Sequence, residues 1–180
     1  SGAIGPIVGQ NAGAGRYDRV RSTLVSAVVF NAVYVLTIWL LLWLCADLIV
    51  NAFSATGLAR DLILFYCNFL VGAFVFNGLL FVSNASFNNL HHAHWATAFN
   101  FGRALLGTIP AVYVGANWYG PRGVMAGEAF GSMLFGLLAI LAAFALVRRL
   151  ERQHQPLPAG DKVSVVLPTD GLPVTREPPL

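Results

Sequence analysis

The residues with the clearest potential for chemistry are three neighbouring histidines, His91, His92 and His94. Three imidazoles this close together could bind zinc. No Cys, Asp or Glu stands near them in the sequence to complete or orient a metal site. We therefore expect a polar loop without a metal or cofactor. The sequence shows no nucleophile with a base and no paired carboxylates, so we expect no enzyme activity.

A glycine-rich segment at residues 9–16 superficially resembles a phosphate-binding loop. It lacks the Gly-Lys-Ser/Thr ending and follows no strand pattern, which argues against nucleotide binding. Glycines here are better explained by the end of a preceding helix and a turn at a membrane surface. The net charge of +3 would suit nucleic acid in a soluble protein, but arginines gathered at helix ends favour loop charge, so no nucleic-acid partner is expected.

A second group of polar side chains lies within long apolar runs. An unpaired amide in lipid is costly, so such residues should face a protein interior or a wet cavity. They could be ordinary contacts between helices, worth about 0.6 kcal/mol per hydrogen bond, or the polar lining of a substrate path. The candidates for such a path are Asn68, Asn77, Asn84, Asn100 and Arg103.

The apolar runs are the elements that must position these residues. The chain is 57% hydrophobic and only 11% charged, with a mean hydropathy of +0.67. A helix needs about 20 mostly apolar residues to cross a hydrocarbon core of about 30 Å. Four stretches meet this length. The sequence therefore predicts an all-α membrane protein, in contact with lipid, with about four transmembrane helices at 22–50, 61–87, 96–119 and 123–147.

Two features of the last two helices predict a kink in one and close packing by the other. Pro110 lies inside the third helix and should kink it. Gly123, Gly127 and Gly131 recur at four-residue spacing in the fourth, giving a face on which another helix can approach closely. Glu128 lies about one turn into this helix. It could be an interfacial or paired residue, or an ionisable functional group.

The positive-inside rule orients the helices. With the first polar segment in the cytoplasm, seven arginines fall inside and two outside. Both chain ends are then cytoplasmic in the inner cell membrane, and Arg103 could reach the cytoplasmic surface through its long stem. The two tryptophans of the first helix, Trp39 and Trp43, would anchor its outer end at the membrane surface. Residues 1–22 should hold the end of a preceding helix and a cytoplasmic loop, residues 22–150 the four-helix region, and residues 151–180 a proline-rich flexible cytoplasmic tail.

Three segments of the sequence stand out as motifs. They are IGPIVGQNAGAGRYDRVR at 4–21, NASFNNL at 84–90, and RALLGTIP at 103–110, followed by Gly120 and Gly123. Together they resemble motifs of the multidrug and toxic compound extrusion (MATE) transporters. The resemblance covers about residues 1–150, and the order of the motifs matches the last four helices of a twelve-helix transporter.

The resemblance implies two six-helix lobes that rock around a central cavity. This chain would supply part of the second lobe, its partner would be a missing N-terminal lobe, and the cargo would be organic cations or drugs exported in exchange for protons or sodium. The sodium-using branch carries an aspartate in the helix matching 61–87. Here Ala73 or Asn77 takes that position, which puts a coupling acid in the missing lobe and favours protons. Two alternatives stay open: a stand-alone four-helix packing protein without transport, and a flippase of the same superfamily for a lipid-linked saccharide.

Overall fold

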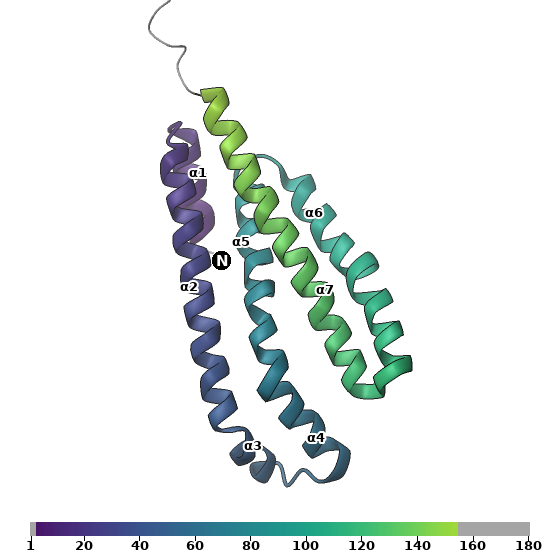
Figure 1. Ribbon diagram of the computed structural model, residues 1–180. Helices are drawn as coiled ribbons and strands as arrows, with labels where there is room; N and C mark the ends of the chain where they lie inside the picture. The colour runs from purple at the N-terminus through teal and green to yellow at the C-terminus, as the bar shows by residue number, and fades with distance from the viewer. Residues whose placement is uncertain (1–2, 155–180) are drawn as a thin grey trace, which may run out of the picture.

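The computed structural model describes residues 3–154, and the regular structure of these residues is helical throughout (Figure 1). Three continuous helical stretches are long and apolar enough to cross a membrane: Tyr17–Leu44, Gly57–Asn89 and Ala93–His154. The predicted all-α membrane protein is thus confirmed. In chain order the elements are α1 (Ile4–Gly13), α2 (Tyr17–Leu44), α3 (Ala46–Ala52), α4 (Gly57–Phe65), the π-helix η1 (Tyr66–Leu70), the 3₁₀ turn η2 (Val71–Ala73), α5 (Phe74–Asn89), α6 (Ala93–Gly102), the π-helix η3 (Arg103–Thr108) and α7 (Ile109–His154).

The last of the three stretches folds back on itself at Gly120. This residue has φ 59° and ψ −137°, a conformation outside the helical region that favours glycine. Pro121 follows at the start of the next helical segment, where its missing N–H leaves no helical bond unmade. The 62-residue stretch therefore forms a hairpin of two arms, 93–119 and 121–154 (Figure 1). With these arms counted separately, the chain has the four predicted spans.

The helix boundaries differ from the predicted ones in informative ways. The first span was expected at 22–50, but α2 begins at Tyr17 and ends at Leu44. Cys45 leaves helical geometry there, and α3 follows as a separate short helix. The second span begins earlier than predicted, at Gly57, and is interrupted by η1 and η2 in its middle. Hydropathy located the spans but carried no information about these interruptions.

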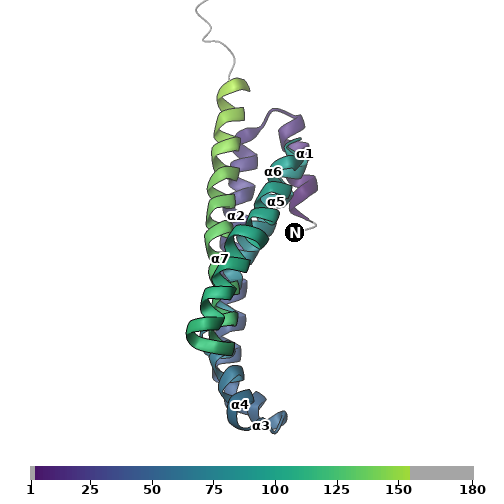
Figure 2. The same cartoon turned by 90° about the vertical axis from the view of Figure 1, so that its right-hand side faces the viewer.

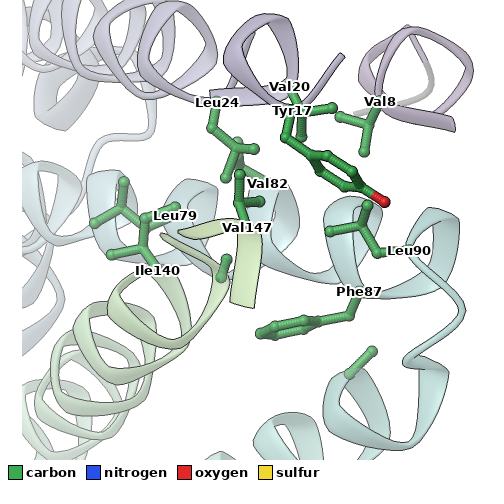
Figure 3. Close-up of a cluster of buried hydrophobic side chains, with 12 residues drawn as sticks. Val8, Tyr17, Val20, Leu24, Leu79, Val82, Phe87, Leu90, Ile140 and Val147 are labelled. Atoms are coloured by element: carbon green, nitrogen blue, oxygen red, sulfur yellow. The ribbon is translucent and has the colours of Figure 1, made fainter. Parts of the chain in front are cut away.

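The helices lie side by side in a long, thin arrangement, as two perpendicular views show (Figures 1 and 2). The most extensive contacts join α5 to α7 and α7 to η3. Buried apolar side chains gather at the end of the molecule where α1, α2, α5 and α7 meet; Val8, Leu24, Phe87 and Val147 are at its centre (Figure 3). This core fixes α5 against α7 and so positions the polar residues farther along both helices.

The predicted tail at 151–180 lies mostly outside the described residues. Its first four residues continue α7, which ends at His154. At the other end, α1 occupies the segment that was expected to end a preceding helix.

Candidate functional site

The second span is irregular near its middle. The π-helix η1 and the 3₁₀ turn η2 follow one another over Tyr66–Leu70 and Val71–Ala73. Trp39 supports this segment from α2: its indole Nε1 donates a hydrogen bond of 3.1 Å to the carbonyl of Asn68. A Cβ on Gly72 would lie 3.3 Å from the same indole ring. The ring of Trp39 is thus partly buried against the irregular backbone; its role as a membrane-surface anchor stays a prediction.

A small pocket, lined by apolar residues and a few polar ones, lies between this irregular segment and the second arm of α7. Its volume is about 90 Å³, room for a few water molecules. Tyr66 and Asn77 line it from the second span, and Glu128 and Ser132 line it from α7. Irregular backbone at membrane depth is tolerated where it is buried in protein or lines a cavity. The interruption of the second span therefore lies where the irregular backbone lines the pocket.

Glu128, which lines the pocket, and Arg103, beside it, lie along the arms of the hairpin rather than at their ends. Glu128 is eight residues beyond the turn at Gly120, which corresponds to about 12 Å along a helix. Arg103 is ten residues beyond Ala93, the start of α6, or about 15 Å. With the turn at Gly120 and the start of α6 taken as the two membrane surfaces, both positions fall inside a hydrocarbon layer of about 30 Å.

Arg103 reaches across to α7. Its Nη1 donates a hydrogen bond of 3.2 Å to Ser132 Oγ. The Arg103 Nε is buried and, among residues 3–154, has no hydrogen-bond partner. The hydroxyl of Thr108, at the other end of η3, is in the same situation within the described chain. The guanidinium therefore points into the protein at mid-depth, contrary to the expectation that it reaches the cytoplasmic surface.

The five substrate-path candidates do not form one site. Asn77 lines the pocket with Glu128, and Arg103 contacts its edge through Ser132. The backbone carbonyl of Asn68 accepts the hydrogen bond from Trp39. Asn84 lines a separate hollow of about 350 Å³ beside Gly5 of α1. The Asn100 amide donates to the carbonyl of Ala96 in its own helix, at 2.7 Å.

The glycine face of α7 lies against the other arm of the same hairpin. Gly123 packs on the backbone of Gly115. A Cβ on Gly127 would lie 2.6 Å from the backbone of Ala111, and one on Gly131 would lie 2.7 Å from Thr108. Pro110 is the second residue of α7, two residues after the end of η3. The neighbour that approaches these glycines is therefore part of this chain.

The three histidines lie at the turn between α5 and α6. His91 has φ 61°, and the rings of His92 and His94 are 5.7 Å apart. One ring nitrogen of His92, Nδ1, is 2.7 Å from the carbonyl of Leu90. Within residues 3–154 no group of three His, Cys, Asp or Glu side chains is placed to hold a metal ion.

Sequence reasoning missed three residues near the site and gave Trp39 a different role. Tyr66 and Ser132 line the pocket, and Trp39 contacts η1. Asn31 of α2 donates to the carbonyl of Val75 at 2.9 Å. A signal existed for Ser132, which is four residues after Glu128 and so on the same helical face. The sequence gives no comparable signal for Tyr66, because its position depends on the π-helix.

Comparison with known proteins gives one family and several solved structures. The family model described as MatE matches residues 1–114, and no curated protein matches the chain. A structure of the Vibrio cholerae MATE transporter VcmN in the bent form is similar with a TM-score of 0.77 at 20% identity, over 85% of this chain and 35% of that one.

Two structures of a multidrug resistance MATE family transporter of the MOP superfamily are also similar. The inward-facing form has a TM-score of 0.75 at 15% identity, over 83% of this chain and 35% of that one. The outward-facing form has the same TM-score at 16% identity, over 83% of this chain and 34% of that one. The chain therefore spans about a third of the length of the solved structures that it matches, and its fold is equally similar to both conformations.

Proposed function

The chain belongs to the MatE family of membrane transporters, and from this premise we propose that it forms the C-terminal part of the second lobe of a secondary antiporter. The proposed cargo is an organic cation or drug, exported in exchange for protons or sodium. The proposed partner is the N-terminal lobe of the same transporter. The proposed location is the inner cell membrane, with the turn between α1 and α2 and the end of α7 on the cytoplasmic side.

The family match over residues 1–114 and the similarity of the fold to MATE transporter structures support this proposal. A lobe that rocks against another lobe must be rigid. The extensive α5–α7 contact and the buried core between α1, α2, α5 and α7 supply that rigidity. The small pocket lies on this rigid unit, so its environment would change when the other lobe moves.

A flippase for a lipid-linked saccharide is the second candidate, and Arg103 is the observation that favours it. Its guanidinium at mid-depth could pair with a phosphate of such a lipid. A stand-alone packing protein is the third candidate. It has less support, because the glycine face proposed to recruit a partner is already covered by the chain's own hairpin.

The test uses the full-length transporter encoded with this chain, purified and reconstituted in liposomes. We expect ethidium to accumulate against its gradient when a proton or sodium gradient is imposed, and dissipating the gradient to abolish the accumulation. A lipid-linked oligosaccharide added in parallel should not change sides. Flipping of that lipid without ethidium transport would favour the flippase, and movement of neither would contradict a transport function.

A further inference from the structure

We propose that the end of the molecule where α2 begins and α7 ends binds the head groups of anionic phospholipids. This surface, the basic end, consists of six arginines: Arg16, Arg19, Arg21, Arg148, Arg149 and Arg152. Lipid binding at the basic end is separate from the proposed transport of a cargo and does not depend on it.

The fold brings together two groups of arginines that are far apart in the sequence. One group flanks the start of α2, and the other lies in the last two turns of α7. The rings of Tyr17 and His154 join the two helices there, with centroids 4.8 Å apart. Tyr17 and Val147 also belong to one buried core, and both views of the ribbon place these helix ends at the same end of the molecule (Figures 1 and 2). The six arginines therefore form one surface.

The arginines of the basic end are exposed and have no carboxylate partner within the described chain. The segments 14–21 and 147–154 contain two acids, Asp18 and Glu151. Among residues 3–154, neither acid lies within 4.0 Å of an arginine nitrogen, since the ion pairs at that distance are those of Arg60 and Arg122 at the opposite end. The positive charge of the basic end is thus available to an external anion.

Apolar side chains continue from the basic end along the outside of both helices. On α2, exposed valines follow Arg21 at four-residue spacing, and on α7 exposed leucines precede Arg148 on one face. These residues are Val25, Val29 and Val33 of α2, and Leu134, Leu138 and Leu141 of α7. Both helices are apolar enough to cross a membrane. A phospholipid can therefore place its head group on the arginines and its acyl chains on the apolar side chains, whereas a soluble phosphate would contact only the arginines.

The chemistry of the arginines favours a phosphate. A guanidinium can donate two parallel hydrogen bonds to a phosphate, and it keeps its charge at every physiological pH. Clusters of four to eight basic residues next to a membrane-spanning helix are typical of surfaces that bind anionic lipids. Each arginine near an anionic membrane surface contributes about fivefold in affinity, which corresponds to about 1 kcal/mol. Loss of two arginines should then weaken binding about thirtyfold.

The test measures binding of phosphatidylglycerol to the full-length transporter in detergent by native mass spectrometry. It compares the wild type with Arg21→Gln/Arg148→Gln and with Arg60→Gln/Arg122→Gln. The second double variant is the matched control, because it removes the same charge from the ion-paired arginines of the opposite end. We expect binding to weaken about thirtyfold for Arg21→Gln/Arg148→Gln and to stay within about threefold of the wild type for the control. Phosphatidylcholine should bind all three proteins equally.

A measurement on the wild type tests the surface if the first double variant does not fold. Raising the salt concentration from about 0.05 M to about 0.5 M shortens the screening length about threefold. We expect this change to weaken the binding of phosphatidylglycerol and to leave phosphatidylcholine unaffected. Salt-independent binding, equal affinity for the two lipids, or equal weakening by the two double variants would overturn the proposal. Displacement of phosphatidylglycerol by inorganic phosphate at equal concentration would also overturn it, because the surface would then recognise a soluble phosphate and not a lipid.

Discussion

At the scale of single residues, Arg103 and Ser132 form the most consequential contact. A guanidinium at mid-membrane depth must be paired or hydrogen bonded, because its transfer from water is unfavourable. In the described chain its hydrogen-bond partner is the hydroxyl of Ser132, which is 1% exposed. The bond also joins η3 to α7 beside the small pocket. Loss of this hydroxyl should therefore lower the free energy of unfolding more than loss of the hydroxyl of another buried serine.

Ser132→Ala tests this contact. We expect it to lower the free energy of unfolding by about 1–3 kcal/mol, because it leaves the partly buried guanidinium without its acceptor. Ser83→Ala is the matched control: Ser83 is equally buried, but its hydroxyl donates only to the carbonyl of Leu79 in its own helix. That carbonyl keeps its helical backbone bond, so we expect a change below about 0.5 kcal/mol. Thermal unfolding of the full-length protein in detergent measures both, and equal shifts would contradict the special role of Ser132.

At the scale of elements, the hairpin of 93–119 and 121–154 depends on close backbone contact. The glycines at 115, 123, 127 and 131 let the two arms approach until backbone meets backbone. In lipid, helices gain little from burying apolar surface, so van der Waals contact of this kind is a main source of association. The hairpin should thus be sensitive to a single added methyl group.

Gly127→Ala measures that sensitivity. The added Cβ would lie 2.6 Å from backbone atoms of Ala111 and Val112, and overpacking of this kind costs about 1–3 kcal/mol. Gly13→Ala is the control, since no atom lies within 4 Å of a Cβ there. Alanine also has the higher helix propensity, by about 1 kcal/mol. We expect the unfolding midpoint to fall for Gly127→Ala and to stay or rise for Gly13→Ala. The reverse order would show that the arms are not in contact.

The extent to which sequence predicts this structure differs between elements. Hydropathy is enough for the four spans, because crossing a bilayer requires length and apolarity and little else. The spacing of Gly123, Gly127 and Gly131 predicts a close approach but not its partner, since spacing carries no information about which helix is adjacent. The interruption at η1–η2 has no sequence signature, because a π-helix depends on tertiary support such as the Trp39–Asn68 hydrogen bond. The Asn77 and Glu128 side chains were each singled out, but their shared pocket was not.

At the scale of the whole molecule, the two ends of the helix layer differ in charge. At the end near α3, Arg60 pairs with Asp47 at 3.7 Å and Arg122 pairs with Asp61 at 3.3 Å. At the opposite end lie the arginines that flank α1, α2 and the end of α7. Because Arg103 lies at mid-depth, the positive-inside count is reduced from seven arginines to six: Arg16, Arg19, Arg21, Arg148, Arg149 and Arg152. The bias keeps its sign, with these six arginines at one end and Arg60 and Arg122 at the other.

Thiol labelling in intact cells tests the resulting orientation. In a Cys45→Ser/Cys67→Ser background, we expect Thr56→Cys to react with a membrane-impermeant maleimide added from outside, because Thr56 lies in the exposed connection between α3 and α4. Gln153→Cys, in the last turn of α7, should react only after the cells are permeabilised. Three of the four spans, 57–89, 93–119 and 121–154, separate the two positions in the chain. The positions must therefore lie on opposite sides if all three spans cross. Labelling of both positions from outside would show that one of these spans does not cross the membrane. Labelling of Gln153→Cys from outside and of Thr56→Cys only after permeabilisation would show the opposite orientation with the same fold.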